Sequence, residues 1–280
     1  MVLDLERDPD KDTLTDGRSP GSADFVQSLE RGLAVIRAFS AEHPELTLSE
    51  VARATSLTRA AARRFLHTLV ELGYVSQAGR LFALRPRILE LGFAYLSSLG
   101  LSEVATPHLE ALVATVHESS SVSVLADDEV VYVARVPTRR IMTVVIGVGT
   151  RFPAYATSMG RALLAGQGDE WLERYLASVR LFPLTQWTIT DPAKLRAEIL
   201  QVRRQGWAMV DEELEEGLRA IAVPIHDLHG KVIAAVNVSA PTRRGGPEFL
   251  REELLPHLLA AVRRIEEDLR AVTPRGAKSD

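Results

Sequence analysis

Residues Thr47–Arg85 read TLSEVARATSLTRAAARRFLHTLVELGYVSQAGRLFALR. Thr47 and Glu50 have the spacing of a capping box, in which each side chain satisfies a free backbone amide at the start of a helix. Thr58 is placed to cap a second, longer helix, which Gly73 would end. The apolar residues of this second helix recur at helical spacing and form one stripe: Ala62, Phe65, Leu66, Leu69 and Val70. The stretch therefore predicts two helices joined by a tight turn.

The pattern changes after the second helix. From Tyr74 to Leu84 apolar and polar residues nearly alternate, and Gly79 marks a turn inside this segment. Near-alternation on both sides of a glycine is typical of a β-hairpin. Two helices followed by such a hairpin form a winged helix-turn-helix, whose second helix lies in the major groove of DNA.

The outward face of the second helix carries basic side chains. Arg59, Arg63 and His67 follow one another at intervals of four residues, opposite the apolar stripe. Arginine binds guanine edges or phosphate through a planar fork of donors, and Arg80 lies in the hairpin turn, where a wing reaches DNA. A plain solvated helix surface would carry similar charges, but the helix-turn-helix context favours groove contact. The predicted DNA-binding residues are Thr58, Arg59, Ala60, Arg63, Arg64, His67 and Arg80.

Positive charge is concentrated in this part of the chain, although the whole chain of 280 residues carries a formal charge of −4. Residues 1–24 contain three basic and seven acidic residues, and residues 25–85 contain eight basic and five acidic residues. The remainder contains 22 basic and 25 acidic residues. Because a protein neutralises DNA phosphates locally, the positive sign of residues 25–85 matters more than the total.

The composition excludes several classes of protein. A hydrophobic content of 46% is enough for two domains with real cores, and the absence of cysteine excludes disulfides and thiolate metal sites. Residues 1–24 are acidic and do not resemble a signal peptide, and no apolar run approaches the roughly 20 residues that span a bilayer. We therefore expect a cytoplasmic protein with no cofactor, no metal and no membrane partner.

The pattern also predicts how the chain is organised. A helix over Gln27–Ser40 completes the core of the DNA-binding domain. The helix over Pro86–Ser98 is apolar around most of its circumference, which favours packing against a second subunit. The predicted segments are a disordered leader (1–24), the winged helix-turn-helix domain (25–85), a linker helix (86–100), a second domain (101–272) and a polar tail (273–280).

The second domain mixes helices with strands. The predicted strands, several of them joined by hairpins, are Ser121–Ala126, Val130–Val136, Ile141–Val148, Ala208–Asp211, Arg219–His226 and Lys231–Ala240. A loop over Gly149–Thr157 leads into a helix over Ser158–Ala165, and a long amphipathic helix covers Pro247–Ala271. The other predicted helices are one that runs to Glu118, Asp169–Ala177 and Pro192–Gln205. Six strands with flanking helices are typical of an α+β domain with a mostly antiparallel sheet.

The start of the helix at Ser158 is a candidate ligand site. The first amides of this helix, those of Ser158, Met159 and Gly160, have no intrahelical partner. Such a helix start binds anions through its free amides and its positive dipole end, and a carboxylate is a natural ligand. The alternative is an ordinary helix start capped by Thr157.

Other polar residues are candidates for the same site. Asn237 and Ser239 occupy alternate positions of an apolar strand, so they share one face, which points either into a polar pocket or into solvent. Asp211 ends another strand. Arg135 or Arg151 could add positive charge toward a carboxylate, and either could instead be a surface residue.

An enzymatic alternative rests on Ala156–Gly160, which resembles the nucleophile elbow of serine hydrolases. Asp211 and then His226 or His229 follow it in hydrolase order. However, alanine stands where the strained elbow needs its first glycine, and no strand leads directly into the serine. The histidines also lack the helical spacing and third ligand of a zinc site. A serine hydrolase with an appended DNA-binding module is therefore the weaker alternative.

Four segments together resemble the IclR family of bacterial transcriptional regulators. They are SLERGLAVIRAFS (Ser28–Ser40), LTLSEVARATSLTRAAARRFLHTLVELGYV (Leu46–Val75), ATSMGRALLA (Ala156–Ala165) and EGLRAIAVPI (Glu216–Ile225). Within the family, FPAYATSMGRALLA and DEELEEGLRAIAVPI are most similar to regulators of the β-ketoadipate pathway. Those regulators respond to protocatechuate, 4-hydroxybenzoate, β-ketoadipate or related carboxylates.

The resemblance implies that the second domain binds an effector and is built on a curved antiparallel sheet. The residues that match the family's pocket positions are Ser158, Met159, Asp211, Leu218, Ala220, Asn237 and Ser239, to which the helix start adds Gly160. The family also implies a dimer, or a dimer of dimers, on a palindromic double-stranded DNA operator. We therefore predict a DNA-binding regulator of aromatic-acid catabolism genes, controlled by a small aromatic or dicarboxylic acid, and not an enzyme.

Overall fold

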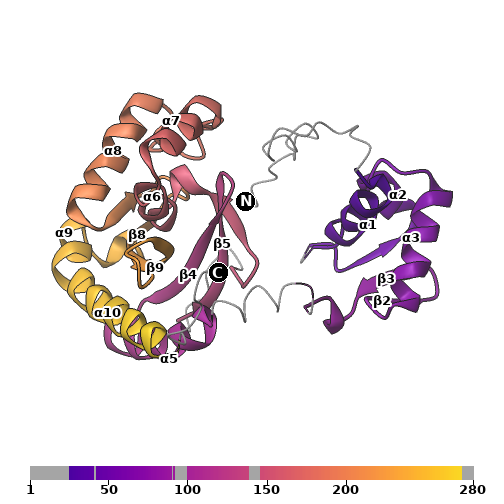
Figure 1. Ribbon diagram of the computed structural model, residues 1–280, viewed down its shortest axis with the longest axis horizontal. Helices are drawn as coiled ribbons and strands as arrows, with labels where there is room; N and C mark the ends of the chain where they lie inside the picture. Colours follow the sequence, from indigo (N-terminus) through magenta and orange to yellow (C-terminus); the bar gives the residue numbers. More distant parts are fainter. Residues whose placement is uncertain (1–24, 41, 90, 92–99, 139–145, 273–280) are drawn as a thin grey trace, which may run out of the picture. The chain divides into compact units, whose positions relative to one another are not determined.

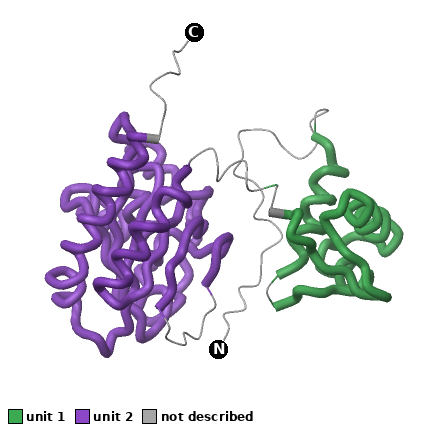
Figure 2. The backbone as a smooth tube through the Cα atoms, turned by 90° about the horizontal axis from the view of Figure 1, so that it is seen from below, with its two compact units in different colours: residues 1, 3–95 green, residues 2, 96–280 purple. Residues whose placement is uncertain are grey.

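The structure is a computed structural model that describes residues 25–40, 42–89, 91, 100–138 and 146–272. The chain divides near residue 95 into two compact units, which Figure 2 shows in separate colours. The predicted leader (1–24), the tail (273–280) and most of the linker helix (86–100) lie outside the described residues. Pro86–Leu89, at the start of that predicted linker, form a short 3-10 turn, η1.

The first unit is a winged helix-turn-helix, as predicted. In chain order its elements are α1 (Gln27–Arg37), β1 (Glu45–Thr47), α2 (Leu48–Ala54), α3 (Arg59–Glu71), β2 (Val75–Ala78) and β3 (Leu81–Leu84). The strands form an antiparallel sheet in the order β1-β3-β2, in which β2 and β3 are the predicted hairpin. Strand β1 was not predicted, because three residues are too few to show alternation and only the pairing with β3 reveals the strand.

The predicted caps of this unit are confirmed. Thr47 N donates to Glu50 Oε2 at 2.7 Å, and Glu50 N donates to Thr47 Oγ1 at 3.4 Å, which completes the capping box. Thr58 Oγ1 accepts a hydrogen bond from Ala61 N at 3.2 Å. Gly73 follows the end of α3 with a φ of +80°, a left-handed conformation that glycine adopts without strain.

The second unit is the predicted α+β domain. Its elements are α5 (Leu101–Val116), β4 (Ser119–Ala126), β5 (Glu129–Val136), β6 (Arg151–Pro153), η2 (Ala154–Ala156), α6 (Ser158–Ala165), α7 (Asp169–Ser178), α8 (Pro192–Gln205), β7 (Ala208–Asp211), β8 (Leu218–His226), β9 (Val232–Pro241), η3 (Thr242–Arg244), α9 (Pro247–Phe249), η4 (Leu250–Leu254) and α10 (Leu255–Val272). The strands form one curved sheet in the order β6-β5-β4-β9-β8-β7, and each neighbouring pair is antiparallel.

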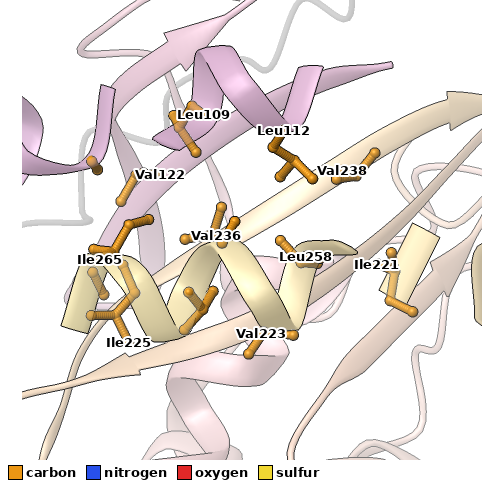
Figure 3. Packing of buried hydrophobic residues seen from close by; sticks show 14 of the residues in the cluster. Leu109, Leu112, Val122, Ile221, Val223, Ile225, Val236, Val238, Leu258 and Ile265 are labelled. Atoms are coloured by element: carbon orange, nitrogen blue, oxygen red, sulfur yellow. The ribbon is translucent and has the colours of Figure 1, made fainter. Parts of the chain in front are cut away.

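Helices cover both faces of this sheet (Figure 1). On one face, Leu109 and Leu112 of α5 and Leu258 of α10 pack against Val236 and Val238 of β9 (Figure 3). Each of these side chains is at most 4% exposed, so each contributes roughly 1.5–3 kcal/mol through burial. On the other face lies α6, whose eight residues are all buried, with α7 and α8 packed around it.

One predicted strand lies elsewhere in the structure. The prediction over Ile141–Val148 falls partly outside the described residues, and Ile146–Val148 are not in a strand. Instead β6 forms within the predicted loop Gly149–Thr157 and pairs with β5, where Phe152 faces Val130. Strand β6 ends in Pro153, and it is the edge of the sheet, where a residue without an N–H is tolerated.

The predicted terminal helix over Pro247–Ala271 is interrupted. A π-helical turn, η4, lies between α9 and α10. Pro256 lies two residues after the end of this turn, and proline has no N–H for the bond to the residue four positions earlier. The wider turn before Pro256 accommodates the missing bond.

Two expectations about composition can be compared with the described part of the chain. No helix there is both long and apolar enough to cross a bilayer. Likewise, no group of three or more histidine, cysteine, aspartate or glutamate side chains is arranged to hold a metal ion there.

Candidate effector site and DNA-binding surface

The face of the sheet toward α6 carries the polar residues of β9. Val236 and Val238 pack with α5 and α10, whereas Ala235 packs with α6. Because side chains alternate along a strand, Asn237 and Ser239 lie on the same face as Ala235. Both line a cavity there, so the inward orientation, which the sequence left open, is the observed one.

A β-bulge brings two more side chains to this face. Between Val122 and Ser123 the register of β4 against β5 shifts by one residue, so β5 contains one residue without a partner opposite. In a regular strand Tyr132 and Arg135 would point to opposite faces, because they are three positions apart. The extra residue shifts the alternation by one position, so the side chains of Tyr132 and Arg135 point to the same face and both line the cavity.

The cavity is built from β5, β7, β8, β9, the start of α6, the loop after β7 and Ile146, which precedes β6. Its lining residues are Tyr132, Arg135, Ile146, Thr157, Ser158, Val210, Leu214, Leu218, Ala220, Asn237 and Ser239. Of the predicted effector-binding residues, the structure therefore brings together Ser158, Leu218, Ala220, Asn237 and Ser239.

The electrostatics of the cavity favour an anion. Among the lining residues that the structure describes, Arg135 alone carries a charge, and its Nη1 donates to Ser121 Oγ at 3.2 Å. Burial lowers the pKa of Arg135, but a guanidinium keeps its proton at neutral pH. Burial raises the pKa of Tyr132 to about 12, so its phenol stays un-ionised and is able to donate a hydrogen bond.

Polar groups in the cavity differ in whether they already have partners. Asn237 Oδ1 accepts from Ser121 N at 3.1 Å, and Asn237 Nδ2 donates to Ser239 Oγ at 2.9 Å, which holds this amide in place. By contrast, the hydroxyl of Ser158 is buried and makes no hydrogen bond to any described residue. Since buried hydroxyls are normally paired, its partner is expected inside the cavity.

Two of the predicted effector residues at the start of α6 lie outside the lining. Thr157 Oγ1 accepts a hydrogen bond from Gly160 N at 3.0 Å, so the helix cap already uses that amide. A Cβ at position 160 would lie 2.0 Å from the carbonyl oxygen of Ala154, so glycine is required for packing. Met159 is fully buried in the core around α6. The amides of Ser158 and Met159 still have no intrahelical acceptor by position.

Asp211 and Arg151 also lie away from the cavity lining. Asp211 Oδ1 accepts a hydrogen bond from Arg219 Nε at 2.5 Å. Arg151 Nε donates to Glu129 Oε2 at 2.7 Å, and both side chains are partly exposed. Of the two arginines considered as carboxylate partners, the structure therefore brings Arg135 and not Arg151 to the cavity.

The residues of the hydrolase alternative are not arranged as a triad. Asp211 is paired with Arg219, and His226 Nδ1 lies 2.9 Å from Glu266 Oε1. Neither contacts the hydroxyl of Ser158, which has no hydrogen-bond partner among the described residues. A nucleophilic serine needs a base within hydrogen-bonding reach, so this geometry does not favour the alternative.

The predicted DNA-binding residues share one property. All of them, Thr58, Arg59, Ala60, Arg63, Arg64, His67 and Arg80, are exposed. On α3 the residues opposite them, Ala62 and Leu66, are fully buried in the core of the unit. Arg63 Nε lies 3.5 Å from His67 Nε2, so these two side chains lie side by side on the exposed face. Their contact with DNA stays a prediction.

Several lining residues were not predicted from the sequence. They are Tyr132, Ile146, Val210 and Leu214, together with Thr157, which was considered only as a cap. A bulge changes which residues of β5 share a face, and no local signal in the sequence marks it. Leu214 lies in an acidic stretch, and only the folding of the loop after β7 brings it to the cavity.

A winged helix-turn-helix unit followed by an α+β unit with an internal polar cavity defines the class, a DNA-binding transcriptional regulator with a ligand-binding domain. The chain belongs to the IclR family. The IclR helix-turn-helix domain matches residues 28–79, and the bacterial transcriptional regulator IclR C-terminal domain matches residues 93–267. The predicted family and class are confirmed, and the hydrolase alternative gains no support.

Known relatives agree over most of the chain. The Pca regulon regulatory protein of Pseudomonas putida is 48% identical over 244 residues, which are 87% of this chain and 84% of that protein. A putative transcriptional regulator from Rhodococcus sp. RHA1 has a solved structure with 57% identity and a TM-score of 0.80, covering 89% of this chain and 100% of that one. An IclR homolog from Microbacterium hydrocarbonoxydans, complexed with 4-hydroxybenzoate, has 30% identity and a TM-score of 0.79, covering 87% and 99%. The predicted likeness to regulators of the β-ketoadipate pathway is thereby confirmed.

Proposed function

We propose that this regulator controls genes of aromatic-acid catabolism in response to a small carboxylate that binds in the cavity, and that it has no catalytic activity. The names of two relatives support an aromatic acid. One is a Pca regulon regulatory protein, and the other is complexed with 4-hydroxybenzoate. A dicarboxylic acid is the alternative ligand. In this account the protein works in the cytoplasm, where a small acid and chromosomal DNA are both available to it.

The observation that carries the proposal is the position of Arg135 in a cavity with Ser158. A guanidinium presents donors in a planar fork that matches the two oxygens of a carboxylate, and Arg135 brings the positive charge to the cavity lining. The hydroxyl of Ser158, which lacks a partner among the described residues, adds a further donor. Ser239 and Asn237 offer uncharged polar contacts, and Leu214 and Leu218 offer apolar ones. We assign no contact with the effector to Met159, Gly160 or Asp211.

DNA binding is proposed for the exposed face of α3 and for the turn between β2 and β3. Arg59, Arg63 and Arg64 enter the major groove, and Ala60 and His67 lie beside them. Thr58 holds the start of α3 close to the DNA backbone. Arg80 reaches the DNA backbone from the wing. Two copies of α3 in a dimer, or four in a dimer of dimers, read the half-sites of a palindromic operator. The DNA-binding domains of the oligomer adopt two arrangements that differ in operator affinity. The effector binds one arrangement more tightly than the other, so effector binding favours that arrangement and changes operator affinity.

The test measures binding of 4-hydroxybenzoate, protocatechuate and β-ketoadipate by calorimetry. We expect at least one of them to bind, and Arg135→Met to weaken that binding by roughly 10-fold to 100-fold, because it removes charged hydrogen bonds to the carboxylate. Arg151→Met is the matched control, since this arginine pairs with Glu129 outside the cavity, and it should leave the affinity unchanged. Equal affinity in the wild type and Arg135→Met would contradict the proposal.

The absence of catalysis is tested separately with a fluorophosphonate probe. Such a probe labels an activated serine, and Ser158 has no base within hydrogen-bonding reach among the described residues. We expect no labelling of the wild-type protein, measured by mass spectrometry of the intact chain. Labelling that is lost in Ser158→Ala would restore the hydrolase alternative.

A further inference from the structure

A buried ion pair joins α6 to the loop between β7 and β8. The side chain of Arg161 is 2% exposed and that of Glu213 is 9% exposed. Arg161 Nη2 donates to Glu213 Oε2, and Arg161 Nε donates to the carbonyl oxygen of Tyr155 at 3.0 Å. The guanidinium therefore connects the segment that leads into α6 with a carboxylate from a different part of the chain.

Glu213 also binds a third segment, the loop between α7 and α8. Its Oε2 accepts a hydrogen bond from Ile189 N at 3.1 Å, and its carbonyl oxygen accepts one from Thr188 Oγ1 at 2.7 Å. The backbone carbonyl oxygen of the neighbouring residue Glu212 accepts a hydrogen bond from Thr185 Oγ1 at 2.7 Å. Glu213 thus connects three segments: its own loop between β7 and β8, the loop between α7 and α8, and, through Arg161, the segment that leads into α6.

Both ends of the ion pair lie next to the wall of the cavity. Arg161 is three residues after Ser158 on α6, and Glu213 immediately precedes Leu214; both Ser158 and Leu214 line the cavity. Leu218, the first residue of β8 after this loop, lines it as well. In the order of the sheet, this loop belongs to the β7 edge, and three strands, β4, β9 and β8, lie between β7 and the strand β5 that carries Arg135.

We propose that Arg161 and Glu213 are positioning residues for the effector, because their ion pair holds the loop that contains Leu214 and leads into Leu218 of β8 against α6. The inference rests on the proposed function, since it assumes that a carboxylate effector occupies this cavity. It extends that function to residues that touch no effector themselves. Their role is to set the shape of the apolar wall that the effector meets when its carboxylate binds Arg135.

Stability alone gives a weak reason for this arrangement. Desolvation of two charges offsets most of their attraction, so apolar residues of similar size often serve equally well in a core. An apolar pair, however, would not reproduce the bonds to the carbonyl oxygen of Tyr155 and to the amide of Ile189. The ion pair therefore fixes the relative positions of these three segments, and an apolar replacement would not fix them.

The decisive test separates positioning from stability with two variants. Glu213→Gln leaves the guanidinium of Arg161 buried without its counter-charge, so we expect a lower melting temperature and weaker binding of 4-hydroxybenzoate. The double variant Arg161→Met/Glu213→Leu removes both charges and keeps an apolar core. For it we expect a smaller loss of melting temperature than in Glu213→Gln, but effector binding still weakened by about tenfold, because the loops are no longer held together.

A milder variant and a control complete the set. Thr188→Val keeps the ion pair and the shape of the side chain. It removes the bond to the carbonyl oxygen of Glu213 together with the one that Thr188 Oγ1 accepts from Thr185 N, and we expect about threefold weaker effector binding. Glu173→Gln is the matched control, because Glu173 forms an exposed ion pair with Arg196 and neither residue lines the cavity. For this control we expect wild-type effector affinity. Operator affinity without effector, measured for each variant, shows whether the protein is folded.

The outcomes distinguish this inference from the proposed function. If the double variant regains both wild-type stability and wild-type effector affinity, the pair has only a structural role and the inference is overturned. If the double variant does not fold, unchanged effector affinity in Thr188→Val overturns it, and weakened affinity supports it. If wild-type protein binds none of the three acids, the proposed function fails first and for a different reason.

Discussion

The two helices that matter most for function, α3 and α6, begin in the same way and end up in opposite surroundings. Thr58 caps α3 by accepting a bond from Ala61 N at 3.2 Å, and Thr157 caps α6 by accepting one from Gly160 N at 3.0 Å. The first residues of α3, Arg59 and Ala60, are exposed, whereas all eight residues of α6 are buried.

The comparison teaches that two helices with the same kind of cap can face different surroundings, and in our proposal those surroundings decide the size of the anionic partner. A start that faces solvent and carries exposed arginines suits the phosphates and base edges of DNA. A start that faces an enclosed cavity admits only a small anion. The arginines of the two helices differ in the same way, because Arg63 of α3 is exposed whereas Arg161 of α6 is buried.

The largest expected effect concerns the glycines of two helices in different surroundings. Gly160→Ala places a Cβ 2.0 Å from the carbonyl oxygen of Ala154, so we expect a loss of about 3 kcal/mol in the free energy of unfolding. Gly32→Ala in α1 is the control, because its Cβ would meet only Phe65, at an ordinary 3.8 Å. There the higher helix propensity of alanine should stabilise the protein by up to about 1 kcal/mol.

Urea denaturation followed by circular dichroism measures both variants. Opposite signs for the two substitutions would support the view that α6 is held tightly against η2. A Gly160→Ala protein as stable as the wild type would show that the start of α6 is able to move, and the comparison between a fixed and an exposed helix start would fail.

The next effect tests the exposed helix. Arg63→Ala should weaken binding to a promoter fragment from upstream of the protein's own gene by roughly 10-fold to 100-fold, with effector affinity intact. Arg174→Ala removes an equally exposed arginine from α7 and should change neither quantity. Fluorescence anisotropy at fixed salt measures the operator affinity. An unchanged affinity in Arg63→Ala would remove α3 from the DNA interface.

The smallest effect is a difference between the two caps. Thr58→Ala removes an exposed cap, which costs about 1 kcal/mol. Thr157→Ala leaves the amide of Gly160 buried without a partner, so its cost should be larger, about 2 kcal/mol. Thermal unfolding of the two variants measures both costs. Equal costs would mean that water or a neighbouring group replaces the buried cap.

The sequence predicts those parts of the fold that local chemistry determines. The capping box at Thr47, the cap at Thr58 and the stop at Gly73 depend on residues within one turn of each other, and each is found in the structure. Helices α6 and α8 and strand β7 have the predicted bounds, because their ends coincide with a cap, a glycine or a change of period.

The parts that were missed depend on contacts between distant segments. The bulge in β5 is a property of its pairing with β4, and it alone brings Tyr132 and Arg135 to one face. Strand β6 was expected among the β-branched residues before Gly149, whereas pairing with β5 selects Arg151–Pro153. The same limit explains why Arg135 and Arg151 were equivalent candidates from the sequence, although the structure brings only the first to the cavity.

The central claim is that a carboxylate in the cavity of the second unit controls DNA binding by the first. The most direct test is the operator affinity of the wild type and of Arg135→Met, each measured with and without 4-hydroxybenzoate. We expect the acid to change the affinity of the wild type by fivefold or more, which is about 1 kcal/mol of coupling, and to leave Arg135→Met unchanged. An equal response of the two proteins to the acid would contradict the account.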